Sequence, residues 1–273
     1  MKVSELLQRY DNGQRNFCQI NLANADLREA NLCEIDLSRA NLIKANLSGA
    51  TLGGAIFTQA FMDRVNLMGA NLIGANLQET SLHEASLSQA NLQGANLKGA
   101  NLSESNLSGS ILNHGNLRGA SLSRTKLIEA SMCHALLEYA NLSHAILNSA
   151  TLKQAKLAHS ILCQATLEIA DLQQADLSQA ILVGSNFRRA NLREASLRSS
   201  NLMGTCLRAA DLHKATLYRA QLHWANFSQA DLSEAVLMDT DFSLSNLSES
   251  NLDGASIVGA QFPKGFELET RIR

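Results

Sequence analysis

The sequence has very little proline and few aromatic residues. Its 273 residues include one proline, Pro263, and only 4% aromatic side chains. A backbone with so little proline keeps almost every N–H group available for hydrogen bonding, as a long uninterrupted ladder requires. A core built on large aromatic rings is excluded. The hydrophobic content of 45% still supplies ample apolar surface to bury.

Charge, apolar runs and paired cysteines are also scarce. The formal net charge of -2 gives no global field that would draw nucleic acid or a membrane to the protein. No apolar run reaches the 18 or so residues of a transmembrane helix, and residues 1–13 lack the apolar stretch of a secretion signal. The cysteines are odd in number and scattered, which favours reduced thiols in a cytoplasmic protein over a disulfide framework. They are Cys18, Cys33, Cys133, Cys163 and Cys206.

What the sequence does contain is a five-residue repeat, plain in LSQANLQGANLKGANL over residues 87–102. From Phe17 to Phe262 there are fifty consecutive repeat centres, and 41 of them are leucine. A small residue nearly always stands two places before the centre, and Asn, Asp, Ser or Thr commonly stands one place before it. The repeat runs without an insertion, so it leaves no loop that would house an active site.

A period of five excludes the common regular structures. On an α-helix, five residues advance the side chain by about 500°, so the leucines would wander around every face. On a flat strand, successive leucines would alternate between the two faces. One buried row therefore requires the chain to turn a corner in each repeat, with the centre and the small residue pointing inward. The sequence predicts a solenoid whose coils stack about 4.8 Å apart.

Residues 90–94, Ala-Asn-Leu-Gln-Gly, are one copy of the pattern A(D/N)Lxx. In this the sequence resembles the pentapeptide-repeat family over about nine-tenths of its length. The lead-in ELLQRYDNGQRNF looks like that of the cyanobacterial members. The resemblance implies an all-β fold: a right-handed quadrilateral parallel β-helix, a repeat solenoid of about 12 coils with four repeats per coil and a short N-terminal capping helix.

The two ends depart from the repeat. Residues 1–14 are predicted to form a capping helix with Ser4 as N-cap and a stop at residues 11–13, too short to bind a membrane. Residues 15–263 form the predicted β-helix.

Residues 264–273 are predicted to be a C-terminal cap or tail. Phe266, Leu268 and Ile272 fold back over the last coil in one interpretation and mediate association in the other, as in some family members. The protein is thus expected to be a monomer, or a dimer through its C-terminal end.

With four sides, residues twenty apart lie above one another, which predicts an apolar strip on an otherwise polar surface. Trp224 follows Gly184 and Gly204 in its column, so the indole is expected over bare glycine backbone. The strip is a candidate protein-interaction site, and ordinary variation at tolerant positions is the alternative. It comprises Ile161, Cys163, Ile181, Val183, Met203, His223 and Trp224.

Charge is unevenly distributed near the C-terminal end. Residues 180–219 are mostly basic among their charged groups, whereas residues 220–263 carry acidic groups and no basic one. A candidate basic patch could bind an acidic partner, but its residues fall on at least three sides, which favours a solvated surface. The patch comprises Arg188, Arg189, Arg193, Arg198 and Arg208.

No cofactor, metal or catalytic site is predicted. His114 and His134 would stack beside Cys133, but they lack a fourth ligand and supporting hydrogen bonds. No nucleophile–base pair, phosphate loop or HExxH motif is present.

We therefore expect a non-catalytic structural or protein-interaction module that binds an unidentified protein, with no membrane and no direct nucleic-acid contact. The alternative is a DNA-mimicking modulator of a type II topoisomerase, DNA gyrase, as some family members are. The near-neutral charge and the absence of inserted loops disfavour it.

Overall fold

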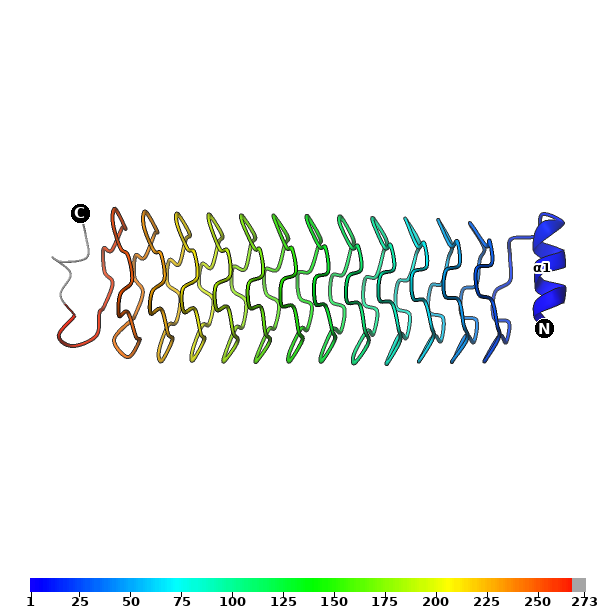
Figure 1. Ribbon diagram of the computed structural model, residues 1–273, viewed down its shortest axis with the longest axis horizontal. Coiled ribbons are helices and arrows are strands. Elements are labelled where there is room, and N and C mark those ends of the chain that lie inside the picture. The colour runs from blue at the N-terminus through cyan, green and yellow to red at the C-terminus, as the bar shows by residue number, and fades with distance from the viewer. Residues whose placement is uncertain (267–273) are drawn as a thin grey trace. The chain divides into compact units, whose positions relative to one another are not determined.

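The computed structural model describes residues 1–266, and the chain divides into two compact units, Met1–Leu136 and Leu137–Arg273. Unit 1 contains the one helix of the described residues, α1 (Val3–Asp11), followed by successive turns of the repeat (Figure 1). Unit 2 consists of further turns of the same repeat. In the described part of the chain, no strand is longer than a single bridging residue.

Helix α1 begins two residues before the sequence predicted. Lys2 is the N-cap, in an extended conformation and without a side-chain cap bond. The N–H of Leu6 already donates to the carbonyl of Lys2 at 3.1 Å, so Ser4 lies inside the first turn and its prediction as N-cap is wrong. The stop at residues 11–13 is confirmed, since the helix ends at Asp11 and Gly13 has φ +91°.

One side of α1 lies against the first coil. Leu6 and Tyr10 are buried, and the Tyr10 hydroxyl donates to the carbonyl of Cys33 at 2.9 Å. The Arg15 guanidinium lies over the Tyr10 ring, 3.9 Å from its centroid. Burial raises the pKa of the Tyr10 hydroxyl above its ordinary value, so the hydroxyl keeps its proton and remains a donor. The boundary between residues 14 and 15 stays a prediction.

Each coil contains four repeats, because every bridge joins two residues twenty positions apart. The bridges are parallel, and the bridging residue is the one immediately before a centre, as in Asn71↔Asn91. In unit 1 they run from Asn16↔Asp36 to Asn116↔Leu136, and in unit 2 from Asn141↔Ile161 to Asp241↔Gln261. The predicted stacking of residues twenty apart is confirmed within each unit.

The hydrogen bonds of one repeat explain its preferred residues. In the repeat centred on Leu92, four N–H groups donate to backbone carbonyls of the neighbouring coils or of the turn. The remaining N–H, that of Gln93, donates to Asn91 Oδ1 at 3.1 Å. Asn or Asp before the centre therefore satisfies the one donor that the ladder leaves over.

The second residue after each centre forms the corner. Its φ is positive, +66° at Gly94 and +59° at Gln89. Glycine suits this corner, since it adopts such angles without steric cost. Larger residues adopt the same conformation at most other corners of the described chain.

The core consists of the centres and of the small residues two places before them. Ala90 and Leu92 are fully buried, as are most of their counterparts. Where serine replaces alanine, its hydroxyl finds a carbonyl, as when Ser105 Oγ donates to Leu102 O at 2.6 Å. Serine and threonine therefore enter the core without leaving an unpaired polar group.

Aromatic rings gather at the C-terminal end of the described residues. The rings of Phe242 and Phe262 stack 5.5 Å apart, and those of Phe262 and Phe266 stack 5.4 Å apart. A turn brings Phe266 back, since its N–H donates to the carbonyl of Pro263 at 3.0 Å. Leu268 and Ile272 lie outside the described residues, so the choice between cap and association stays a prediction.

Candidate interaction surfaces

The apolar strip predicted from the sequence lies on one face of unit 2. Ile161 and Ile181 are joined by a parallel bridge, and the N–H of Gly184 donates to the carbonyl of Met203 at 2.9 Å. The N–H of Gly204 donates in the same way to the carbonyl of His223. Ile181 is 41% exposed and Trp224 63% exposed, while the other members are half-buried. The strip therefore spans four successive coils.

The face that carries the strip is uncharged over those four coils. The outward positions beside Leu162, Leu182, Leu202 and Leu222 include no Asp, Glu, Lys or Arg. The first charged residue of the next coil on this face is Asp241. The absence of charge is not peculiar to this face, since the outward positions beside Leu47, Leu67, Leu87 and Leu107 in unit 1 carry no charged residue either. What distinguishes the strip is its run of apolar side chains.

The isoleucines of the strip cost the protein two internal hydrogen bonds. Ile161 and Ile181 occupy positions where Asn or Asp usually accepts the N–H of the residue after the centre. Within the described residues, no side chain accepts the N–H of Cys163 or Val183, whereas Met203 N–H still donates to Asn201 Oδ1 at 3.1 Å. Two backbone donors therefore stand among the apolar side chains of this face.

Trp224 does not cover its glycine neighbour as expected. A Cβ atom placed on Gly204 would meet nothing within 4 Å, so the indole lies away from that backbone. The ring instead leans toward His223, with the two centroids 6.1 Å apart and the planes tilted by 50°. His223 Nε2 lies 3.0 Å from Asp241 Oδ2. Hydrogen bonds from Ser243 and the contact with His223 lower the pKa of the Asp241 carboxyl.

Sequence reasoning missed one member of this surface, Leu244. It lies one coil after Trp224 in the same column and is 55% exposed. Adding twenty to the number of Trp224 would have found it. Leu244 extends the apolar surface beyond the seven predicted residues.

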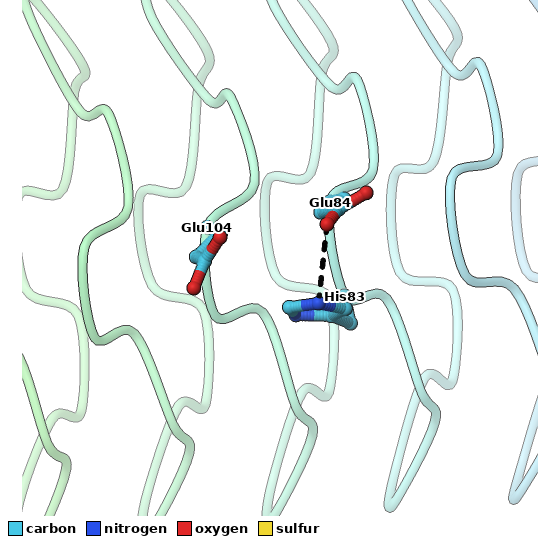
Figure 2. Close-up of side chains that lie close together, drawn as sticks. All are labelled: His83, Glu84 and Glu104. Carbon is cyan, nitrogen blue, oxygen red and sulfur yellow. Dashed lines mark ion pairs between the residues drawn. The ribbon is translucent and has the colours of Figure 1, made fainter.

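The histidines of unit 1 behave in two ways. The rings of His114 and His134 stack 4.8 Å apart and only 3° from parallel, so their nitrogen lone pairs do not converge on one point. A different group, His83, Glu84 and Glu104, brings one ligand atom from each residue within 4.8 Å of the others (Figure 2). The sequence analysis did not single out this second group.

Two of the five arginines of the predicted basic patch form ion pairs. Arg188 pairs with Glu168 at 3.4 Å, and Arg193 pairs with Asp211 at 3.1 Å. The guanidinium of Arg198 lies 5.1 Å from the centroid of the Tyr218 ring. Only Arg188, Arg189 and Arg208 share a face, since Arg193 and Arg198 flank other centres. The five arginines therefore form no common patch.

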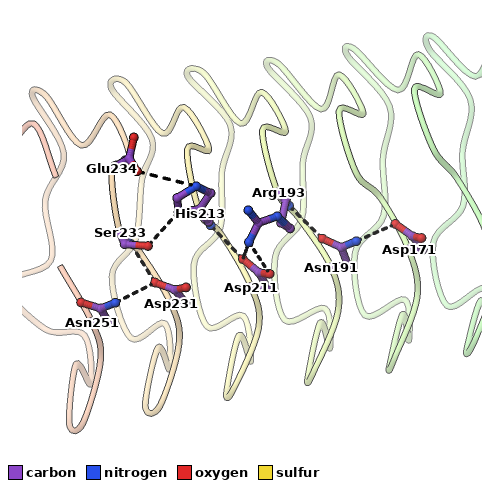
Figure 3. A network of polar contacts seen from close by, with 9 residues as sticks. All are labelled: Asp171, Asn191, Arg193, Asp211, His213, Asp231, Ser233, Glu234 and Asn251. Carbon is purple, nitrogen blue, oxygen red and sulfur yellow. Dashed lines mark hydrogen bonds and ion pairs between the residues drawn. The ribbon is translucent and has the colours of Figure 1, made fainter. Parts of the chain in front are cut away.

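The uneven distribution of charge along the chain has a structural counterpart. Lys214 pairs with Glu234 at 3.4 Å and Arg219 with Asp239 at 3.5 Å, each one coil apart. On the face shown in Figure 3, Asn191 also donates to Asp171 and Asn251 to Asp231. The basic and acidic segments thus lie side by side in successive coils and compensate each other.

Comparison with known proteins identifies the family. A family model described as pentapeptide repeats matches in eight copies, over residues 20–59, 66–103, 100–138, 115–154, 125–162, 170–208, 204–233 and 230–264. The protein belongs to the pentapeptide-repeat family. No curated protein matches it.

Several pentapeptide-repeat proteins of known structure are similar. HetL from the cyanobacterium Nostoc sp. strain PCC 7120, involved in heterocyst differentiation regulation, is 35% identical; the match covers 82% of this chain and 96% of HetL, with a TM-score of 0.42. The protein alr5209 from Nostoc PCC 7120 is 37% identical over 38% of this chain and 80% of its own, with a TM-score of 0.29. QnrB1, a plasmid-mediated fluoroquinolone resistance protein, is 19% identical over 75% of this chain and 87% of its own, with a TM-score of 0.47. The predicted likeness to cyanobacterial members is confirmed.

One group in this pentapeptide-repeat protein has the elements of a nucleophile and base. His213 Nδ1 lies 2.8 Å from Ser233 Oγ, and His213 Nε2 lies 3.8 Å from Glu234 Oε1 (Figure 3). The N–H of Ser233 donates to Asp231 Oδ1 and that of Glu234 to the carbonyl of Asp253. Because these N–H groups are already engaged, they offer no oxyanion hole, and the arrangement does not support acyl transfer.

Among the described residues, no helix has the length and apolar character needed to cross a membrane.

Proposed function

We propose that this pentapeptide-repeat protein is a non-catalytic binding module that holds another protein against the uncharged face of unit 2. The observation that carries the proposal is the run of apolar side chains, with Ile181 and Trp224 exposed, on a face without charged residues over four coils. The exposed Leu244 extends it into the next coil, which also carries Asp241. Aromatic residues and methionine are enriched in protein interfaces, and charged residues are depleted in their centres. Arg188, which borders this face, is engaged with Glu168.

The proposal also says what the partner must supply. The free N–H groups of Cys163 and Val183 lose their water when the face is covered, which costs about 1–3 kcal/mol for each donor left unpaired. A fitting partner therefore places acceptors, such as backbone carbonyls, opposite the two isoleucine repeats. Strand-like segments carry acceptors at suitable spacing.

The test compares two double variants in capture experiments from the native cell. Met203→Gln with Trp224→Gln should abolish capture of the partner, because it removes the most exposed ring of the strip and its neighbouring thioether. Met68→Gln with Tyr139→Gln removes an exposed methionine and an exposed aromatic ring elsewhere and should leave capture intact. The melting temperatures of all three proteins should agree, since none of these side chains belongs to the core.

Tryptophan fluorescence gives a second readout, because Trp224 is the only tryptophan. Once a captured partner is purified, its binding should shift the emission of Trp224 to shorter wavelength. Capture that survives the Met203/Trp224 change, or emission that does not move, would contradict the proposed face.

Finer features belong to the same proposal. Four repeats per turn and fifty repeats correspond to about 12 coils, and membership of the family supports a right-handed, four-sided coil. The cysteines are free and half-buried, which suits a reducing compartment such as the cytoplasm. Association through the C-terminal end remains the alternative to a monomer.

Modulation of DNA gyrase is the competing function, and it predicts a different outcome. DNA mimicry requires a strongly acidic surface, whereas the protein is near neutral and two of the acidic residues near the C-terminal end, Glu234 and Asp239, are paired with basic ones. A supercoiling assay with and without the protein distinguishes the two functions. Clear inhibition or protection of the enzyme would favour the competing function over ours.

A further inference from the structure

Two carboxylates meet on successive coils of unit 1. Arg64, Glu84, Glu104 and Arg124 occupy one corner column, each twenty residues from the next. Arg64 Nε forms a short ion pair with Glu84 Oε2, and Arg124 lies 3.6 Å from Glu104 Oε1. The basic residues thus hold the outer ends of the column, and the two glutamates are neighbours in its middle.

His83 stands beside Glu84 and has a fixed tautomer. Its Nδ1 lies 3.0 Å from the carbonyl oxygen of Ser103, and a carbonyl oxygen can only accept. Nδ1 therefore carries the proton, and in the neutral ring the lone pair is on Nε2. That atom lies 3.5 Å from Glu84 Oε1 (Figure 2). In the neutral ring an acceptor faces an acceptor, which is unfavourable, whereas either a proton on Nε2 or a metal cation between the two atoms makes the contact favourable.

We propose that His83, Glu84 and Glu104 bind a divalent transition-metal ion of the Zn²⁺ class. His83 Nε2 and one carboxylate oxygen from each glutamate are the ligands, and water completes the coordination. Ligand atoms about 2.1 Å from a tetrahedral metal lie roughly 3.4 Å apart, close to the 3.5 Å between His83 Nε2 and Glu84 Oε1. This proposal is independent of the binding face in unit 2.

Each ligand has the outer partner that metal ligands typically have. The histidine donates its other N–H to a backbone carbonyl, the arrangement that orients metal-binding imidazoles. Arg64 holds the distal oxygen of Glu84. Glu104 must move toward the histidine from within 4.8 Å, a small change for an exposed side chain.

His213 in unit 2 provides a matched control. It also stands close to a glutamate, Glu234, with its Nε2 3.8 Å from Oε1. Its Nδ1, however, contacts the hydroxyl of Ser233, which can donate as well as accept. The Nε2 of His213 can therefore carry the proton and donate to Glu234, so no cation is needed there.

The experiment titrates the full-length protein with Co²⁺ alone and follows the visible absorption of the bound ion. Co²⁺ also reports its ligands, because thiolate ligation adds intense near-ultraviolet absorption that nitrogen and oxygen ligands lack. Wild-type protein should show a site without thiolate absorption. H83Q and E104Q should each weaken binding by roughly tenfold or more, and H213Q should leave it unchanged. H83Q and E104Q should melt at the wild-type temperature without metal, because both side chains are partly exposed to solvent.

Four outcomes would overturn the proposal. These are no Co²⁺ absorption at millimolar concentration, a thiolate spectrum that assigns the ion to a cysteine, unchanged affinity in H83Q, and equal loss in H213Q. Bound Co²⁺ that is displaced by Zn²⁺ and that raises the melting temperature of wild-type but not of H83Q would support it, since a ligand stabilises the state that it binds.

Discussion

Single residues at the corners of the coil decide part of its stability. Gly204 and Ala209 occupy corners of adjacent repeats in unit 2, with φ of +66° and +55°. A residue with a Cβ atom pays about 1–2 kcal/mol in this conformation, whereas glycine pays instead through the freedom that it loses on folding. The two positions therefore allow glycine to be replaced by alanine at one corner and alanine by glycine at the next.

Gly204→Ala should destabilise the protein by about 1 kcal/mol, and Ala209→Gly should leave it unchanged or stabilise it slightly. The first change adds strain alone, because a Cβ at Gly204 would meet no atom within 4 Å. Denaturant unfolding of the two variants and the wild type measures the difference. If both changes shifted the midpoint in the same direction, the corner angle would not be what determines the choice of residue.

At the scale of the coil, neighbouring turns are joined by polar pairs as well as by the backbone ladder. His223 and Asp241 form such a pair on the strip face, 3.0 Å apart, and Ser243 N–H donates to Asp241 Oδ1 at 2.8 Å. These contacts favour the carboxylate over the carboxylic acid and so hold the pKa of Asp241 below its ordinary value in the folded protein. The folded state therefore stabilises the ionised Asp241 carboxyl more than the unfolded state does.

Asp241→Asn should lower stability at neutral pH by less than about 1 kcal/mol, since the pair is partly exposed. A carboxyl whose folded pKa is depressed contributes above its unfolded pKa of about 3.9 and loses that contribution as the pH falls through the folded pKa. The gap between wild type and variant should thus be constant above about pH 5 and shrink below pH 4. Unfolding free energies measured from pH 3 to pH 7 test this; a gap that widens toward acid would contradict it.

The repeat predicts which residues stack in one column, but it does not predict how their side chains are oriented. A period of twenty correctly places Ile161 beneath Ile181, and the same arithmetic applied to Trp224 and Glu84 would have found Leu244 and Glu104. The tilt of the Trp224 ring and the tautomer of His83 depend on local contacts that spacing does not encode. Ser4 was misassigned as the N-cap. The N-cap is the residue at which the backbone leaves the extended conformation, and several residues near the N-terminus could have taken that position. The pairing of Arg188 with Glu168 follows from the same arithmetic, whereas that of Arg193 with Asp211 depends on side-chain orientation.

At the scale of a whole unit, stability is a sum over neighbouring coils. Every bridge connects residues twenty apart, so each coil touches only the one before and the one after it. An inner coil loses two interfaces when it opens, and an end coil loses one. The apolar strip spans four coils, so it exists only while those coils remain stacked.

This architecture predicts different effects for one substitution at two places in unit 1. Leu32 and Leu72 are both fully buried centres, the first in the coil next to α1 and the second between two other coils. Leu72→Ala should lower the global unfolding free energy by about 2–5 kcal/mol, because the cavity weakens two interfaces. Leu32→Ala should lower the global value less and act through local opening of the first coil. Since Tyr10 donates to Cys33 in that coil, opening it should also release α1. Amide hydrogen exchange should then accelerate in α1 and the first coil of Leu32→Ala while later coils of the unit stay protected. Equal global losses for the two variants, with exchange accelerated evenly along the unit, would show that the coils unfold as one block and not as a chain of neighbours.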